Sequence, residues 1–248
     1  LTIVLFKVIQ NKRIKSLHRE FLIPKIRYLV NIFFQSMPIS IAICGYSVAA
    51  AIIFTYVGMT SEYAAAGYGA ATRIEQVVLL PILGINTALI SIIAQNYGAQ
   101  NHDRIKETYF TAIKYSFFIM VLSGIFIFFT ANIIPTLFSN DPEVIEYGKR
   151  YLKISAFVLP AYPFFFLSNG FFMALKKSEN AMLNNIVRNV LIPILVFYLA
   201  KYISADFDTF FWLWVILQWT VSIILLIIVN YYLNNRLNKS STVINPQP

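Results

Sequence analysis

Hydrophobic runs long enough to cross a bilayer alternate with short polar stretches along almost the whole chain. A spanning helix needs about 20 apolar residues, so this pattern predicts six complete membrane-spanning helices. They are expected at residues 28–57, 64–97, 109–138, 143–175, 181–202 and 210–233. Strict polar–apolar alternation, the pattern of a β-strand, does not compete with this interpretation. The predicted fold class is all-α and polytopic, a lobe of six transmembrane helices.

The polar stretches predict three regions. Residues 1–27 are expected to hold the end of a preceding span and a basic cytoplasmic linker, and residues 28–237 the six-helix lobe. Residues 238–248 form a polar tail. Apolar residues recur at helical spacing among the lysines and arginines of the linker, which is typical of a short amphipathic helix on an anionic membrane face. Because the chain opens inside an apolar run, we expect it to be the C-terminal part of a longer polypeptide.

The second predicted span is unusual because it carries charge at membrane depth. Arg73 and Glu75 lie well inside its apolar run, and such charges each cost about 2.5–3.5 kcal/mol on insertion scales. They therefore normally face a bundle interior or a water-filled cavity. Being two residues apart, they point to different sides of a helix and do not pair with each other. The pattern fits a transport pathway, and a buried ion pair that fixes helix packing explains it equally well.

The fifth predicted span contains a second intramembrane cation. Arg188 lies among Asn184, Asn185 and Asn189, so amide dipoles surround its guanidinium. This grouping predicts a polar, hydrated face, while interhelical hydrogen bonding is the structural alternative. We expect Arg188 toward the cytoplasmic side of the membrane centre and Glu75 toward the other side.

Composition narrows the class of protein. Hydrophobic residues make up 58% and charged residues 12% of the chain. Soluble domains average about 45–50% and 25%, so the composition is that of an integral membrane protein. The net charge of +9 gathers in alternate loops, which the positive-inside rule assigns to the cytoplasm, and nucleic-acid binding is not expected. One cysteine and two distant histidines predict no metal site, and no catalytic motif is present, so an enzyme is not expected.

Several segments resemble one known family. The second span contains the segment GYGAATRIEQVVLLP and ends in Gln95, Asn96, Tyr97, Gly98 and Ala99. This order of motifs is similar to the C-terminal lobe of multidrug and toxic compound extrusion (MATE) transporters. Met37-Pro38 and the run Asp141 to Val144 also match. The resemblance covers residues 25–237 and implies half of a twelve-helix protein, the other half being an N-terminal six-helix lobe. Gln95, Asn96 and Gly98 would shape the cytoplasmic helix end.

The resemblance also implies an activity. Family members are antiporters that expel cationic amphipathic compounds while protons or sodium ions enter, and they need no other cofactor. In the sodium-coupled branch, helix seven carries a glutamate about eight residues after its proline. Tyr46 stands at that position here, which favours proton coupling. Arg73, Glu75, Asn184, Arg188 and Tyr46 are therefore the predicted pathway residues.

We predict a secondary antiporter for cationic drugs, located in the plasma membrane as a multi-pass protein with a cytoplasmic C-terminus. A flippase or exporter of lipid-linked saccharides is the first alternative, and its cavity should be more cationic than Arg73 and Arg188 alone provide. A non-transporting membrane scaffold subunit is the second, and its charged residues should be fully paired inside a closed bundle.

Overall fold

The computed structural model describes residues 26–237 of the chain, and this part is helical, without a β-strand. It divides into two compact units, Leu1–Pro38 and Ile39–Pro248. The described part of the first unit is the beginning of helix α2, and the site discussed below lies within the second unit. The predicted linker helix and polar tail fall outside the described residues.

The helices follow one another with short connections, as the alternation of apolar and polar stretches predicts. Five stretches are long and apolar enough to cross a membrane, two of them made of two consecutive helices, and Cys44–Thr60 is a shorter apolar segment, all within the described residues. The helices are α2 (Ile26–Thr60), α3 (Glu62–Val78), α4 (Leu80–Gly98), α5 (His102–Thr130), α6 (Pro142–Ser155), α7 (Tyr162–Ala174), α8 (Ser178–Ile186), α9 (Ile192–Tyr202) and α10 (Phe207–Tyr232).

Side-chain caps set several helix ends, and one of them corrects the sequence prediction. The third span was expected to begin near residue 109, after a polar loop, but α5 begins at His102. The Asn101 side chain accepts a hydrogen bond from the backbone amide of Arg104, which satisfies one of the free donors of the first turn. The polar residues that suggested a loop therefore form the first turn of the helix.

Three of the membrane passes are interrupted near their middle. Leu79 separates α3 from α4, and Pro81 lies in the first turn of α4. A 3₁₀ turn, Leu159–Ala161, separates α6 from α7, and a π-helical turn, Val187–Leu191, separates α8 from α9. Proline cannot donate to the helical ladder, so these interruptions follow the prolines that the sequence places inside its spans. Each interruption lies close in sequence to a polar residue of the site described below.

Helices α3 and α6 pack so closely that glycine is required between them. A Cβ atom at Gly67 would lie 2.6 Å from the carbonyl oxygen of Val144 and 2.8 Å from the amide nitrogen of Gly148. Both neighbours are backbone atoms, which cannot rotate away as a side chain can. This contact fixes the helix that carries Glu75 against the helix that carries Tyr151.

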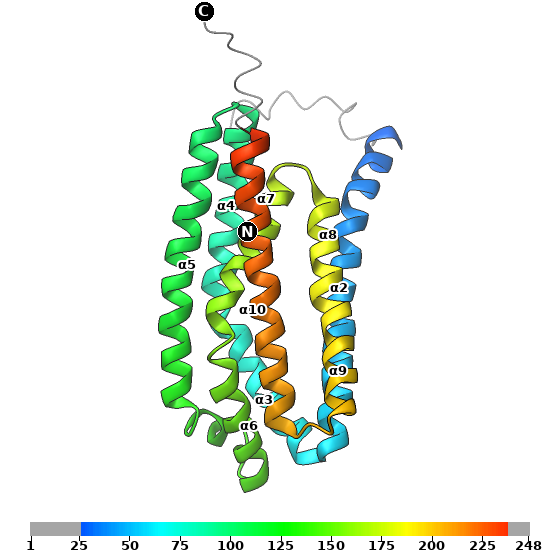
Figure 1. Ribbon diagram of the computed structural model, residues 1–248, viewed down its shortest axis with the longest axis vertical. Helices are drawn as coiled ribbons and strands as arrows, with labels where there is room; N and C mark the ends of the chain where they lie inside the picture. Colours follow the sequence, from blue (N-terminus) through cyan, green and yellow to red (C-terminus); the bar gives the residue numbers. More distant parts are fainter. Residues whose placement is uncertain (1–25, 238–248) are drawn as a thin grey trace, which may run out of the picture. The chain divides into compact units, whose positions relative to one another are not determined.

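The connections alternate between the two ends of the helices in the second unit (Figure 1). The turns at residues 99–101 and 175–177 lie at the same end as the C-terminus of α10. The connections that lead into α3, α6 and α10 lie at the other end. This arrangement agrees with the prediction that alternate loops, which carry the net positive charge, lie on one side of the membrane.

Candidate functional site

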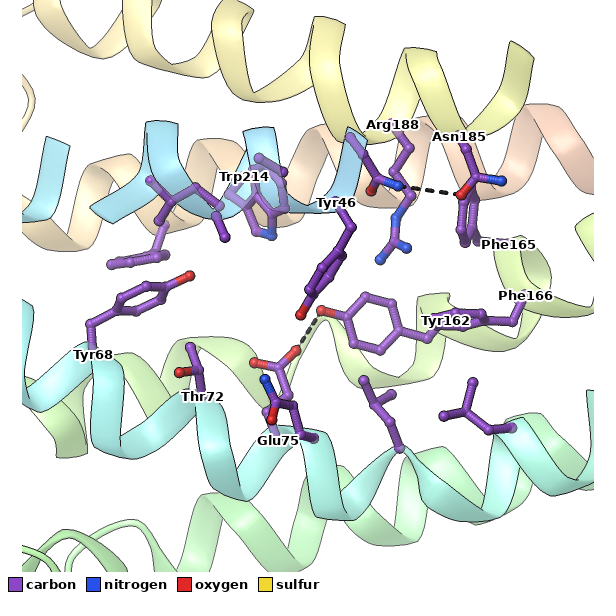
Figure 2. A pocket seen from close by; sticks show the side chains of 18 of the residues that line it. Tyr46, Tyr68, Thr72, Glu75, Tyr162, Phe165, Phe166, Asn185, Arg188 and Trp214 are labelled. Carbon is purple, nitrogen blue, oxygen red and sulfur yellow. Dashed lines mark hydrogen bonds between the residues drawn. The ribbon is translucent and has the colours of Figure 1, made fainter. Parts of the chain in front are cut away.

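A cavity of about 560 Å³ opens among the helices of the second unit, at the level of the helix interruptions. Its lining, all within the described residues, is mainly aromatic and aliphatic and includes one carboxylate and one guanidinium (Figure 2). Drug-sized ligands bind in cavities of about 300–1,000 Å³ with few polar groups, so both size and lining suit such a ligand. The lining residues with polar side chains are Tyr46, Tyr68, Thr72, Glu75, Gln76, Tyr151, Tyr162, Asn185, Arg188, Asn189 and Trp214.

Two tyrosines hold the carboxylate of the cavity in place. Tyr151 donates a hydrogen bond to Oε2 of Glu75, and Tyr162 donates one of 2.5 Å to Oε1. The two donors come from α6 and α7, so three helices meet at this group. Glu75 is only 9% exposed, and each of its oxygens has a donor. A buried carboxylate is tolerated when hydrogen bonds replace its water, and this pair of tyrosines supplies them.

Aromatic rings surround the guanidinium of the cavity. Arg188 lies on the π-helical turn and is 7% exposed, with its Cζ 4.0 Å from the ring centroid of Phe165 and 4.9 Å from that of Tyr162. A third ring, Phe166, lies 5.5 Å away. The Nε of Arg188 donates a hydrogen bond of 2.7 Å to Oε1 of Gln218 on α10. The hydrogen bond to Gln218 and the cation–π contacts thus hold the guanidinium in position.

Glu75 and Arg188 face the same cavity but do not form an ion pair. Within residues 26–237, no carboxylate oxygen lies within 4.0 Å of the Arg188 guanidinium. Tyr162 lies between the two groups, with its hydroxyl on Glu75 and its ring beside Arg188 (Figure 2). The sequence predicts the two charges on opposite sides of the membrane centre, so that they would meet only through tilted helices or a bridging group. The structure brings both to one cavity, because α3 and the π-helical turn pass the same tyrosine.

The remaining predicted pathway residues lie in different surroundings. Tyr46 lines the cavity from α2. Asn184 lies outside the lining and donates a hydrogen bond of 3.2 Å to Oδ1 of Asn169, whereas its neighbours Asn185 and Asn189 do line the cavity. Arg73 is exposed and does not line the cavity, since it points away from the face that carries Glu75.

The predicted helix-end residues form the C-terminus of α4. The carbonyl of Gln95 accepts a hydrogen bond of 3.0 Å from the amide of Ala99, and the carbonyl of Asn96 accepts one of 2.9 Å from the amide of Asn101. Gln100 takes up a left-handed conformation with a φ of 57°. Gly98 is the last residue of α4, and a Cβ atom there would meet open space. The segment therefore ends one helix and leads directly into the cap of α5.

Sequence reasoning did not identify several residues that shape the cavity. Tyr151 and Tyr162 lie 76 and 87 residues from Glu75 along the chain, so no local spacing links them to it. Gln218 lies in the most apolar helix, α10, and was not predicted to contact the site. A polar amide at membrane depth could have indicated that it has a partner in the bundle. The aromatic run at 162–166 supplies three residues of the lining, Tyr162, Phe165 and Phe166.

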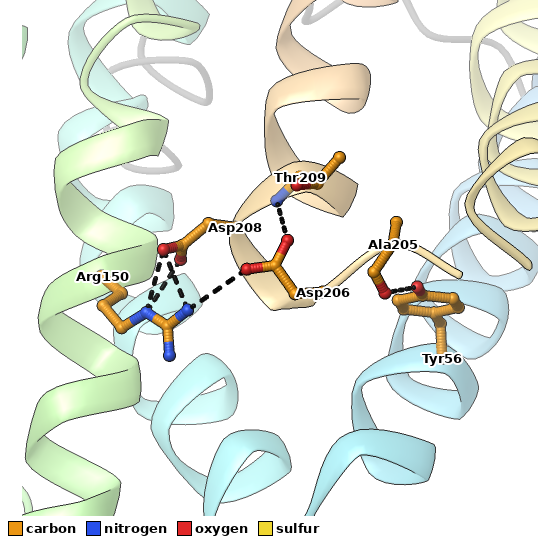
Figure 3. Close-up of polar contacts among 6 residues, drawn as sticks. All are labelled: Tyr56, Arg150, Ala205, Asp206, Asp208 and Thr209. Atoms are coloured by element: carbon orange, nitrogen blue, oxygen red, sulfur yellow. Dashed lines mark hydrogen bonds and ion pairs between the residues drawn. The ribbon is translucent and has the colours of Figure 1, made fainter. Parts of the chain in front are cut away.

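A second polar cluster lies away from the cavity, at the end of α6 and the start of α10 (Figure 3). Arg150 Nε donates to both carboxylate oxygens of Asp208, at 2.9 and 3.1 Å, and its Nη2 lies 3.9 Å from Asp206. Asp206 caps α10 by accepting a hydrogen bond of 3.1 Å from the Thr209 amide. The hydrogen bonds from Thr209, helped by the charge of Arg150, hold the pKa of the Asp206 carboxyl below its usual range.

Comparison with known proteins gives one family and one fold. The family model MatE matches residues 38–199. A crystal structure of MATE in complex with MaL6 aligns with a TM-score of 0.80 at 21% identity, over 88% of this chain and 49% of that one. At this identity the likeness shows the fold. The chain therefore spans about half the length of the solved structure, in agreement with the expected six-helix half.

Two curated relatives are similar over shorter stretches. The FAD transporter of Shewanella oneidensis is 32% identical over 104 residues, which is 42% of this chain and 23% of that protein. The probable multidrug resistance protein YpnP of Bacillus subtilis is 25% identical over 56% of this chain and 30% of its own length. The two names differ in the compound transported, so the relatives leave the ligand of the present cavity to be argued from its residues.

Proposed function

The chain belongs to the MatE family, and from this premise we propose that it forms one lobe of an exporter of small amphipathic aromatic compounds. The proposed partner is a second six-helix lobe, which supplies the other wall of the transport pathway. The aromatic cavity that holds Glu75 carries this proposal, because such a lining takes flat drug-sized molecules. The proposed location is the plasma membrane, with the basic loops and the C-terminus in the cytoplasm.

We propose further that export is coupled to proton entry and that Glu75 takes part in it. Glu75 is the carboxylate of the cavity lining, so it offers a place both for a proton and for the positive group of a cationic compound. Proton binding there would compete with cation binding, which is the exchange that an antiporter requires. Tyr46 supplies no carboxylate to the lining, which favours protons over sodium ions.

The alternatives from the sequence fit the cavity less well. A flippase for lipid-linked saccharides would need several cations to hold a pyrophosphate, and among the described residues the lining offers only Arg188. A scaffold subunit would need neither a cavity of this size nor an arginine held without a carboxylate partner. These observations support a transporter for small aromatic compounds.

The test is dye efflux from cells that produce the chain together with the lobe that precedes it. We expect ethidium efflux that stops when the proton gradient is collapsed and continues when only the sodium gradient is removed. Glu75→Gln should abolish this efflux at unchanged protein level in the membrane. Glu62→Gln is the matched control, because Glu62 is an exposed acid at the start of the same helix. Normal efflux by Glu75→Gln would contradict the role of this carboxylate.

A further inference from the structure

Glu75 and Arg188, the two charged groups of the cavity, differ in how many of their polar atoms already have a hydrogen-bond partner in the protein. Each oxygen of Glu75 already accepts a hydrogen bond from a tyrosine. Arg188 uses its Nε for Gln218, while its terminal amino groups point into the cavity toward Tyr162 (Figure 2). Glu75 can still attract a cation through its charge, and the terminal amino groups of Arg188 offer hydrogen-bond donors to an anion.

A buried cation without a directly paired anion is costly. The described residues supply no carboxylate within 4.0 Å of Arg188, and Glu75 lies farther away, across Tyr162. The aromatic rings on its faces offset part of this cost through cation–π contact. They also hold the guanidinium plane in one orientation, which preserves its planar fork of donors. Such a fork matches a carboxylate, which it can bind through two parallel hydrogen bonds.

We propose that Arg188 is an anion-binding subsite, so that the cavity takes planar aromatic molecules that carry a carboxylate. The carboxylate binds the terminal amino groups of Arg188, and the ring system lies against the aromatic side chains of the same wall. This inference rests on the proposed export function and deepens it, because it adds anionic and zwitterionic compounds to the cationic ones expected from Glu75.

The lining places ring surfaces on both sides of the position that such a ligand would take. Phe165 and Phe166 lie beside Arg188, while Tyr46 and Trp214 line the cavity from α2 and α10. Stacking on aromatic side chains binds flat molecules with little dependence on their substituents. The charge at Arg188 would then decide which of these molecules stay bound.

Two dyes that share a xanthene ring system separate the roles of the two charges. Fluorescein carries a carboxylate and is anionic at neutral pH, whereas rhodamine 6G is an esterified cation. Binding is measured by fluorescence anisotropy on the full-length protein in detergent. We expect Arg188→Gln to weaken fluorescein binding by roughly tenfold or more, which is the loss of one charge-assisted bidentate contact. The same variant should leave rhodamine 6G binding within about twofold of the wild type.

Further variants keep the result interpretable if Arg188→Gln does not fold. Arg188→Lys retains the charge but lacks the planar fork, so fluorescein binding should be weaker than in the wild type and stronger than in Arg188→Gln. Glu75→Gln should act in the opposite direction, weakening rhodamine 6G and leaving fluorescein bound. Arg104→Gln is the matched control, since Arg104 is exposed at the start of α5.

Equal loss of both dyes in the Arg188 variants would overturn the inference, as would a wild-type protein that does not bind fluorescein. Failure of the export proposal has a different signature. In that case the purified protein binds the dyes, but cells that produce it expel neither of them.

Discussion

Two arginines of the lobe are held in opposite ways. Arg150, on α6 beside the start of α10, contacts the rings of Tyr147 and Phe207 and also has Asp208 as an ion-pair partner at 2.9 Å. Arg188, in the cavity, has the rings but no carboxylate within 4.0 Å among residues 26–237. The charge of Arg150 is matched within the protein, while the incomplete pairing at Arg188 leaves donors for a ligand.

The contrast teaches that burial and pairing need not go together. The Arg150 side chain is 32% exposed, so water and salt screen its ion pairs and each contributes little to stability. Arg188 is almost fully buried, where an unmatched charge matters most. A structural role accounts for the ion pairs of Arg150, whereas the interhelical hydrogen bond from Arg188 to Gln218 uses only one of its donors.

The largest loss of stability is expected from breaking the contact between α3 and α6, which supports both the cavity and the cluster around Arg150. Gly67 lies between α3, which carries Glu75, and α6, which carries Arg150 and Tyr151. Gly67→Val would force these helices apart, at a cost of about 1–3 kcal/mol or more, because the obstructing atoms belong to the backbone. Thermal unfolding in detergent measures the loss. Gly84→Val is the control, since a Cβ atom at Gly84 meets nothing within 4 Å. Equal stability of the two variants would contradict the close packing.

A smaller loss of stability is expected from removing the hydrogen bonds that hold the Glu75 carboxylate. Tyr151→Phe and Tyr162→Phe each remove a donor from Glu75, and hydrogen bonds to charged groups contribute about 1.5–3 kcal/mol. The free energy of unfolding should fall within that range for each variant, and by less than the sum for the double variant, since both act on one group. Tyr46→Phe controls for removal of a hydroxyl from the same cavity. An unchanged stability in both single variants would mean that the tyrosines do not hold Glu75.

The smallest effect is expected from pH at the outer cluster. The pKa of Asp206 is lowered in the folded state, so its charge stabilises the fold at neutral pH. That contribution should be lost as the pH falls from the ordinary aspartate range through the lower folded pKa. Asp206→Asn keeps a capping side chain but removes the charge, so its stability should depend less on pH in this acidic range. A pH profile identical to that of the wild type would show that Asp206 does not contribute.

The sequence predicted the helical fold well, because length and hydrophobicity alone determine where a chain can cross a membrane. It also drew attention to Glu75 and Arg188, which both line the cavity, since charge in an apolar run is conspicuous. It could not choose between Arg73 and Glu75, which differ by two positions on one helix and face opposite surroundings. That choice depends on how α3 is rotated against α6, and the glycine contact that sets the rotation joins residues far apart in the chain.

The residues that contact Glu75 and Arg188 could not be predicted from the sequence, for a related reason. Tyr151, Tyr162 and Gln218 are ordinary residues of membrane helices, and none stands at a fixed spacing from the group that it contacts. The helix interruptions bring them together, and a proline in a span predicts an interruption without saying which side chains it redirects. The same limit applies to Asn101, whose role as a cap depends on where the preceding helix ends.

Tyr162 has a consequence for how the two charged sites communicate. One rigid side chain bears the hydroxyl that binds Glu75 and the ring that contacts Arg188. A cargo that moves the ring must also disturb the bond to the carboxylate, and a change at the carboxylate must alter the surroundings of the guanidinium. Thermodynamic linkage makes such an influence reciprocal and equal in both directions. The binding of cargo and the binding of a proton would then affect each other through the side chain of Tyr162.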